Sequence, residues 1–268
     1  MESLLDNVPR LSATRVRIAG LKPRAAELTR RAAAAPEPPS LARALAQAGS
    51  SETVGVIAEV KRRSPSAGSI REDLDPAGHA RSYERGGAVA ISVLTDELHF
   101  GGSLEDLACV AAAVSLPVLR KDFILDELQL CEARAVGASG VLLIVRALSA
   151  GRLRALARAA RDQSLGVLVE VHSEAELEQA LAADPTAVGV NSRDLASFAV
   201  DLRLADRLLA QVPASLPAIA ESGIETRDDV ERLAGAGADL VLVGTSVARQ
   251  ADPEAAVRAL CGVARRGR

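Results

Sequence analysis

Charged side chains stand at the ends of several short apolar runs in this chain. Glu59 and Lys61 end the run that begins at Val54, and Lys121 stands two residues after Leu119. Residues two apart on a strand point to the same side, so Glu59 and Lys61 should act from one side. Ammonium and carboxyl groups gathered in this way can donate and accept protons, which predicts general acid–base catalysis. The set that we single out is Glu59, Lys61, Lys121, Glu170, Asn191, Glu221 and Ser222.

Two glycine-containing turns follow the last two apolar runs and are suited to binding an anion. Ser222-Gly223-Ile224 comes after one run, and Gly244-Thr245-Ser246 comes after the other. Glycine lets backbone N–H groups approach a phosphate closely, particularly where a loop leads into a helix. Either turn alone would be an ordinary connection. Together they predict a phosphate site with the candidate residues Ser222, Gly223, Gly244 and Thr245.

Short β-branched runs recur along the chain and predict eight strands. Between them, segments such as 174–181 carry apolar residues at three- and four-residue spacing, which is typical of helices. No hairpin turn joins any two runs, so the strands should be parallel. We predict an α/β fold, a single (β/α)8 TIM barrel, with an open doubly wound sheet as the alternative. The predicted strands are Val54–Val60, Val89–Leu94, Pro117–Leu119, Val141–Val145, Val167–Val171, Val188–Val190, Ala218–Ala220 and Leu240–Val243.

A structural interpretation competes with the catalytic one. Any one of the charges at the strand ends could be solvated or form half of an ion pair, and for a single residue that interpretation is favoured. A charge at the rim of an apolar barrel is costly to desolvate unless it is paired or used. Several such groups together favour catalysis, because barrel enzymes assemble catalytic residues from several strand ends.

The beginning of the chain differs from the remainder. Residues 1–50 are rich in Arg and Ala and include the proline-containing stretch 35–40, where a helix should stop. We interpret residues 1–50 as an N-terminal helical extension and residues 51–268 as the barrel. A chain of 268 residues fits a single domain, since an eight-fold barrel takes about 250 residues.

Composition and charge limit the expected partners. A net charge of -3 and a pI near 5.8 give no broad basic field, so we expect no nucleic-acid partner. No apolar run approaches the roughly 18 residues of a membrane span and no targeting segment is recognised, so we expect a cytoplasmic protein without a membrane partner. Cysteines and histidines are scattered without metal-ligand spacing, so we expect reduced thiols and no metal.

Longer motifs surround these residues and occur in a fixed order. They are Ile57-Ala58-Glu59-Val60-Lys61-Arg62-Arg63-Ser64-Pro65-Ser66, Ile91-Ser92-Val93-Leu94-Thr95-Asp96, Phe100-Gly101-Gly102-Ser103, Leu119-Arg120-Lys121-Asp122-Phe123-Ile124, Val169-Glu170-Val171-His172, Gly189-Val190-Asn191-Ser192-Arg193-Asp194-Leu195, Glu221-Ser222-Gly223-Ile224 and Val241-Leu242-Val243-Gly244. From about residue 53 to residue 250, the chain resembles the indole-3-glycerol-phosphate synthase family, the ring-closing decarboxylases of tryptophan biosynthesis.

The resemblance implies a substrate, 1-(2-carboxyphenylamino)-1-deoxyribulose 5-phosphate, and a role for each residue. Lys121 would give a proton to the developing alkoxide, and Lys61 would orient the carboxylate or contact the phosphate. Glu170, or else Glu59, would carry the proton transfers that accompany loss of hydroxide. No cofactor and no obligate protein partner is implied. The residues expected to bind substrate are Asn191, Arg193, Glu221, Ser222, Phe100, Phe123 and Ser64.

Aromatic residues are scarce, with 3 Phe, 1 Tyr and no Trp. All three Phe follow predicted strands, in loops at the expected catalytic face. We expect Phe100 and Phe123 to form a flat apolar slot for the anthranilate ring. For Phe198 we favour a structural role in a local cluster of its loop.

Two alternatives remain open. Phosphoribosylanthranilate isomerase shares the fold and also binds an anthranilate and a phosphate. It normally ends its first strand with Cys and its fifth with Asp, where this chain has Glu59-Val60-Lys61 and Glu170. The other alternative is a catalytically silent barrel that serves as a binding subunit. Loss of a lysine or glutamate would indicate this, and all of those expected are present.

Overall fold

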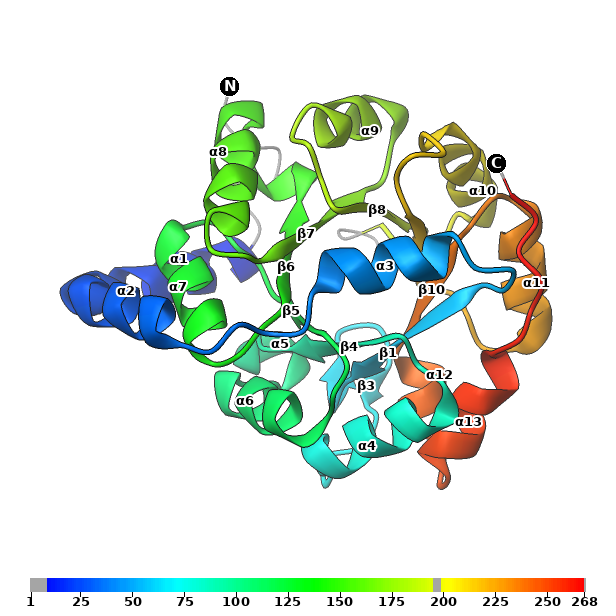
Figure 1. The fold of residues 1–268 in the computed structure, drawn as a ribbon, viewed down its shortest axis with the longest axis horizontal. Helices are drawn as coiled ribbons and strands as arrows, with labels where there is room; N and C mark the ends of the chain where they lie inside the picture. The colour runs from blue at the N-terminus through cyan, green and yellow to red at the C-terminus, as the bar shows by residue number, and fades with distance from the viewer. Residues whose placement is uncertain (1–8, 195–198, 268) are drawn as a thin grey trace.

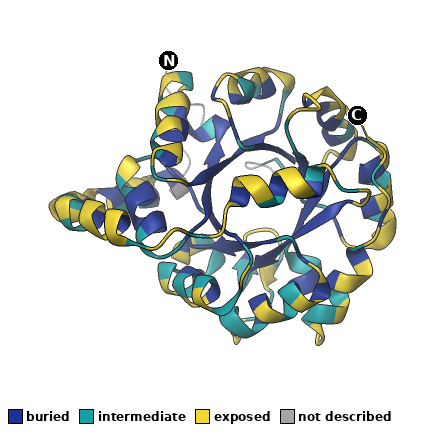
Figure 2. Ribbon diagram, viewed as in Figure 1, coloured by how far each residue is buried: buried dark blue, intermediate teal, exposed yellow. Residues whose placement is uncertain are grey.

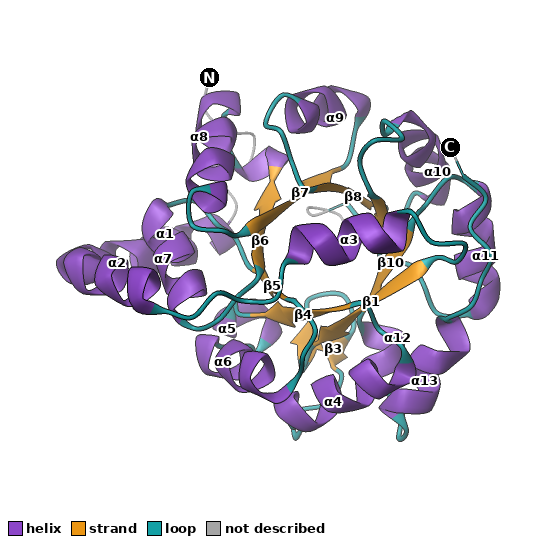
Figure 3. Cartoon of the chain, in the orientation of Figure 1, coloured by secondary structure: helices purple, strands orange, loops and turns teal. Residues whose placement is uncertain are grey.

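The computed structural model describes residues 9–194 and 199–267. Its strands form a closed parallel barrel in the order β1-β10-β9-β8-β7-β6-β5-β4 (Figures 1 and 3). The barrel prediction is confirmed, and the open sheet is wrong, because β1 pairs with both β4 and β10. The barrel strands are β1 (Gly55–Val60), β4 (Ala90–Leu94), β5 (Val118–Lys121), β6 (Gly140–Ile144), β7 (Gly166–Val171), β8 (Ala187–Asn191), β9 (Ala218–Glu221) and β10 (Leu240–Val243).

Some strand ends were predicted too short. The structure extends β5 to Lys121, β8 to Asn191 and β9 to Glu221, whereas the sequence indicated that these polar residues follow the strands. The side chains of Lys121 and Glu221 are compatible with strand structure because they pair with each other across the barrel. The opposite error occurs at Val145, which belongs to the short 3-10 helix η2 (Val145–Ala147) rather than to β6.

Helices surround the barrel, and most begin at an Asp, Ser or Thr whose side chain accepts a backbone N–H of the first turn. These caps fix where each loop turns into its helix. The helices are α4 (Pro76–Gly86), α5 (Glu97–Phe100), α6 (Leu104–Ala113), α7 (Glu127–Ala135), α8 (Ala150–Arg161), α9 (Glu174–Leu181), α10 (Leu202–Gln211), α11 (Arg227–Gly235), α12 (Thr245–Ala248) and α13 (Pro253–Leu260).

The extension is made of separate helices. They are α1 (Pro9–Leu21), the 3-10 helix η1 (Lys22–Arg24), α2 (Ala25–Ala34) and α3 (Leu41–Gly49). The proline-containing stretch separates α2 from α3, as predicted. Helix α2 packs against α7, where Leu28 and Ala32 form a small apolar cluster with Leu21 and Cys131.

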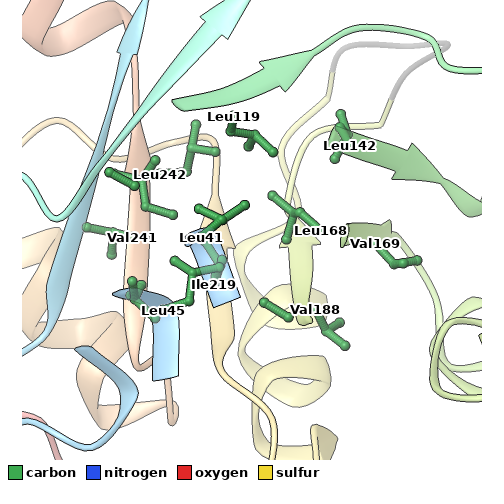
Figure 4. Close-up of a cluster of buried hydrophobic side chains, with 14 of the residues drawn as sticks. Leu41, Leu45, Leu119, Leu142, Leu168, Val169, Val188, Ile219, Val241 and Leu242 are labelled. Carbon is green, nitrogen blue, oxygen red and sulfur yellow. The ribbon is translucent and has the colours of Figure 1, made fainter. Parts of the chain in front are cut away.

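Helix α3 lies across one end of the barrel (Figure 1). Leu41 from its first turn enters the barrel among Leu168, Ile219 and Leu242 (Figure 4). Gly140 and Gly166 begin β6 and β7; a Cβ on Gly140 would overlap Leu41, and a Cβ on Gly166 would be crowded against it. Their lack of side chains therefore lets α3 close the N-terminal end of the strands.

The polar residues that end β5, β8 and β9 lie at the other end of the barrel. The barrel strands are almost wholly buried, whereas α3 carries both buried and exposed residues (Figure 2). The core around them is aliphatic, as the composition required. Among the described residues, no helix is both long enough and apolar enough to cross a membrane.

Leu41→Ala should destabilise the barrel without changing its chemistry. Removing a fully buried leucine typically costs about 2–5 kcal/mol, because a cavity remains. We expect urea unfolding to show a loss of this size and kcat to stay near the wild-type value. Leu41→Met, which conserves volume, is the control and should cost less than about 1.5 kcal/mol. Equal stability of both variants would show that α3 does not seal the barrel.

Candidate active site

Lys121 lies at the centre of a cluster of carboxylates at the C-terminal end of the strands. Its Nζ is 2.8 Å from Glu221 Oε2, 3.6 Å from Glu59 Oε2 and 3.9 Å from Glu170 Oε2. Glu59 Oε1 is also 2.8 Å from the Nζ of Lys61, so Glu59 bridges the two lysines. The structure thus brings all four predicted catalytic residues together, and Glu221 joins them.

The barrel geometry explains why these residues meet. Glu59, Lys121, Glu170 and Glu221 belong to β1, β5, β7 and β9, which are alternate strands around the barrel. In such barrels each interior layer takes one side chain from every second strand. Gly189 on β8 leaves space inside this layer, because a Cβ there would overlap Glu221 Oε1. The charged residues therefore form one complete layer, in place of the usual apolar one.

Burial and opposite charges compete in this layer. For Lys121, burial is outweighed by Glu221, Glu59 and Glu170, which raise the pKa of the ammonium well above its usual value. Burial also opposes ionisation of Glu59, but Lys61 and Lys121 hold the pKa of its carboxyl below the usual value. Burial of Glu221, reinforced by Glu170 and Glu59 and opposed by Lys121, raises its pKa to about 7.

Lys121 is largely buried and is not an exposed residue at the rim of the barrel. Its side chain is 15% exposed, and the three carboxylates around it are at most 2% exposed. A charge buried in this way is held by its partners, so its removal leaves several carboxylates without a cation. Lys121 is therefore part of the packing of the barrel as well as of its polar end.

A cavity, which we call the main cavity, opens above the charged layer. The loop after β1 covers part of it, with a small antiparallel pair of strands, β2 (Arg63–Ser64) and β3 (Gly68–Ser69). Leu94 and Ile144 add apolar surface that the sequence analysis did not single out. The predicted residues that line the main cavity are Glu59, Lys61, Ser64, Phe100, Lys121, Phe123, Glu170, Asn191, Arg193 and Ser222.

The two phenylalanines differ in their surroundings. Phe100, the last residue of α5, is partly buried, whereas Phe123 belongs to the apolar core and is 7% exposed. Both line the main cavity. Phe123 is thus a core residue as well as a cavity wall. Phe198 lies outside the described residues.

A second, more polar hollow adjoins the main cavity, and we call it the polar hollow. It shares Lys61, Arg193 and Ser222 with the main cavity, and it is also lined by the predicted phosphate residues Gly223, Gly244 and Thr245. Ser222 and Gly223 have φ values of 69° and 68°, so the turn after β9 is left-handed at both positions.

Gly244 allows a close approach at the bottom of the polar hollow. A Cβ built on Gly244 would lie 2.5 Å from Glu59 Oε1 and 3.2 Å from Lys61 Nζ. Ser66 and Arg249 also line the polar hollow, and the sequence analysis missed them. Arg249 stands one helical turn after Thr245, a spacing that could have indicated a further cation near the glycine turn.

A buried polar network supports the loop after β5 from outside the barrel. Asp122 accepts hydrogen bonds from Arg120, Thr95 and the backbone N–H of Phe123. Arg17 of α1 donates to both carboxylate oxygens, at 2.8 and 2.9 Å. Burial opposes ionisation of Asp122, but the two arginines hold its pKa below the usual value. The extension is therefore tied to the residue that follows Lys121.

The closed parallel barrel has a charged layer and a glycine-bounded hollow at the C-terminal ends of its strands. This arrangement is typical of barrel enzymes that act on small phosphorylated substrates. The family model for indole-3-glycerol phosphate synthase matches residues 5–260. The chain belongs to this family of carboxy-lyases, which act in tryptophan biosynthesis.

Individual relatives agree with the family model. An indole-3-glycerol phosphate synthase of Mycobacterium avium is 48% identical over 259 residues, covering 96% of this chain and 92% of the relative. Indole-3-glycerol phosphate synthase 2 of Streptomyces coelicolor is 47% identical, covering 88% and 90%. The corresponding protein of a Nocardioides species is 53% identical, covering 78% and 80%. The predicted family is therefore confirmed.

A solved structure shares the fold alone. Thiamine phosphate pyrophosphorylase from Pyrococcus furiosus superposes with a TM-score of 0.58 over 77% of this chain and 93% of its own. Its sequence identity to this chain is 19%. The likeness supports the barrel architecture and carries no further argument.

Glu221→Gln should alter how stability depends on pH. The folded-state pKa of Glu221 lies above its ordinary 4.5, so its contribution to stability is present at low pH and is lost as the pH rises through about 7. We expect the variant to gain stability relative to the wild type between pH 5 and pH 8, by up to about 3 kcal/mol.

The measurement is urea unfolding of both proteins at several pH values. Because Lys121 loses a partner in the variant, the free energy of unfolding shifts at every pH. The diagnostic quantity is therefore how the difference between variant and wild type changes with pH, not its size at one pH. A difference that stays constant across this range would contradict the raised pKa.

Proposed function

We propose that this chain converts 1-(2-carboxyphenylamino)-1-deoxyribulose 5-phosphate to indole-3-glycerol phosphate, carbon dioxide and water. The ring carbon that carries the carboxylate bonds to the sugar ketone carbon. The carboxylate then leaves that ring carbon as carbon dioxide, and the former ketone oxygen leaves as water. The observation that carries the proposal is the ammonium of Lys121, which is held by carboxylates at the base of the main cavity.

We assign to Lys121 the proton that the ketone oxygen takes up during ring closure. Its raised pKa keeps the ammonium protonated near neutral pH. An alkoxide is a far stronger base than an amine, so transfer from the ammonium to the developing alkoxide is favourable. The 2.8 Å contact with Glu221 holds the ammonium in place before the substrate arrives.

We assign the proton transfers of the dehydration to Glu170 first and to Glu59 second. These steps remove a proton from carbon and deliver one to the departing hydroxyl group. Glu59 is held by two lysines, and its lowered pKa makes it a weak base. Glu170 has one lysine nearby, at 3.9 Å, so cations hold it less closely than they hold Glu59.

The phosphate is assigned to the polar hollow. Ser222, Gly223, Gly244 and Thr245 line this hollow, and Lys61 lines both the hollow and the main cavity. The close approach of Lys61 Nζ to Gly244 favours a contact with the phosphate. Because Lys61 also lines the main cavity, orientation of the substrate carboxylate is the alternative.

The substrate ring is assigned to the apolar part of the main cavity, between Phe100 and Phe123. Asn191, Arg193 and Ser64 line the same cavity and would contact the polar parts of the substrate. Glu221 would act through Lys121 rather than by direct contact, because it lies behind the ammonium and is not among the residues that line the main cavity.

The direct test is an activity assay with the purified protein. Incubation with the carboxyphenylamino-deoxyribulose phosphate should produce indole fluorescence together with carbon dioxide. Turnover of phosphoribosylanthranilate instead would favour the isomerase, and turnover of neither substrate by folded protein would favour a silent binding subunit. Either of these outcomes would overturn the proposal.

Lys121→Met should lower kcat by about 10²- to 10⁴-fold, the usual cost of removing a positioned proton donor. The variant should also melt earlier, because three buried carboxylates lose their cation. Kinetics should therefore be measured below its melting temperature. Lys121→Arg is the matched control, since it keeps the charge and moves the donor. A Met variant with half the wild-type kcat would refute the assignment.

Glu170→Gln should lower kcat more than it changes KM, because the proposed role belongs to the transition state. Steady-state kinetics of the variant and of Glu178→Gln, on the exposed side of α9, separate the two effects. A rise in KM alone would make Glu170 a binding residue.

Gly223→Val and Gly244→Val should weaken binding of substrate and of inorganic phosphate together. Valine is strained at the left-handed Gly223, and at Gly244 it would meet Glu59 and Lys61. We expect KM and the phosphate inhibition constant each to rise about tenfold, since a hydrogen bond to a charged group contributes about 1.5–3 kcal/mol. Gly151→Val, on α8 with open space around it, is the control. Unchanged phosphate inhibition in both variants would move the site elsewhere.

Phe100→Ala and Phe123→Leu should impair handling of the substrate ring, with KM raised or kcat lowered several-fold. Ring contacts contribute about 0.5–1.5 kcal/mol beyond burial. Little change in melting temperature is expected for Phe100. Full truncation of the buried Phe123 would be costly, so leucine is chosen to keep the core filled. Variants that melt much earlier and bind substrate normally would make the rings structural.

A further inference from the structure

His172 stands two residues after Glu170 and lies between two carboxylates. Its Nε2 is 3.4 Å from Glu170 Oε1, and its Nδ1 is 3.3 Å from Glu176 Oε2. Glu176 in turn pairs with Arg146, and Arg146 pairs with Asp194, each at 2.6 Å. A continuous polar chain therefore runs from Glu170 to the loop after β8.

The two oxygens of Glu170 face different partners. Oε2 lies 3.9 Å from Lys121, whereas Oε1 is directed to the imidazole. Among the described residues, neither Glu170 Oε1 nor His172 Nε2 has a hydrogen-bond partner, although both atoms are buried. A buried polar atom without a hydrogen-bond partner is costly, so each of these two atoms depends on its 3.4 Å contact with the other.

We propose that His172 is a positioning residue for Glu170, an inference that rests on the proposed role of Glu170 in proton transfer. The imidazole engages Oε1 and so fixes the rotation of the carboxylate. Oε2 then remains directed to Lys121 and the main cavity. Without the imidazole, the carboxylate can turn both oxygens toward Lys121, where it would pair with the ammonium instead of accepting a proton.

The surroundings hold His172 itself in place. Its side chain is 3% exposed, and its backbone N–H donates to Glu176 Oε2 at 2.7 Å. Burial opposes ionisation of Glu176, but hydrogen bonds from His172 and Arg146 hold the pKa of its carboxyl below the usual value. The ionised Glu176 therefore anchors the imidazole on the side away from Glu170.

This series of polar contacts also connects three neighbouring loops of the catalytic face. Arg146 lies in η2 after β6, Glu176 lies on α9 after β7, and Asp194 follows β8. Asp194 adjoins Arg193, which lines both the main cavity and the polar hollow. The position of Glu170 is thereby coupled to the loops that border the substrate.

The test compares variants of His172 by steady-state kinetics and thermal melting. His172→Leu should lower kcat by about 10²-fold with little change in KM, which is the scale expected for a small misplacement of a catalytic group. His172→Gln, which keeps an N–H near the Nε2 position, should recover most of the activity. His172→Asn keeps an N–H on the Glu176 side only and should remain slow.

His79→Leu is the matched control. His79 is a buried histidine on α4 that packs edge-on against Tyr83 and lines neither the main cavity nor the polar hollow. The His79→Leu substitution should lower the melting temperature and leave kcat unchanged. Recovery of activity by the Asn variant and not by the Gln variant would show that His172 only anchors its loop to Glu176, which would overturn the proposal.

A double-variant cycle tests whether His172 acts through Glu170. In a Glu170→Gln background, His172→Leu should change the residual kcat by less than about twofold, since residues that act as one unit are not additive. A further 10²-fold loss would contradict the proposal. Turnover by the wild type separates a failure of the proposed function from a failure of the positioning role of His172. If the wild type is active and His172→Leu keeps its kcat, the positioning role alone fails.

Discussion

A buried ammonium among carboxylates is the interaction on which the rest of this structure depends. Lys121 and its three carboxylate partners are withdrawn from water, which costs several kcal/mol for each ion unless every partner is in place. The four alternate strands that carry these residues must therefore end at the same level of the barrel. A closed barrel meets this requirement, because every strand is fixed by a neighbour on both sides.

The remainder of the fold keeps this layer isolated and aligned. At the opposite end, α3 inserts Leu41 where β6 and β7 begin with glycine, so apolar contacts help to seal that end of the barrel. Outside the barrel, Arg17 of the extension pairs with Asp122, the residue after Lys121. On the other side, His172 and the polar residues that follow it contact Glu170. Lys121 and Glu170 are thus flanked by polar groups that lie outside the charged layer.

Much of this arrangement could be predicted from sequence, because it follows local periodicity. The alternation of strands and helices indicated the barrel, and the two-residue spacing of Glu59 and Lys61 predicted their shared side, which their ion pair confirms. The burial of Lys121 could not be predicted, since its cost is set by carboxylates on strands distant in sequence. The contact of Arg17 with Asp122, 105 residues away, and the fit of Leu41 against glycines depend on packing in the same way.

The most direct test of the central claim is a crystal structure with a substrate analogue whose ketone is reduced to an alcohol. We expect the alcohol oxygen within hydrogen-bond distance of Lys121 Nζ, the ring beside Phe100 and Phe123, and the phosphate in the polar hollow. Lys121 should keep its contact with Glu221 in that complex. An alcohol oxygen bound away from Lys121, with the ammonium still enclosed by its three carboxylates, would contradict the assignment of Lys121 as the proton donor.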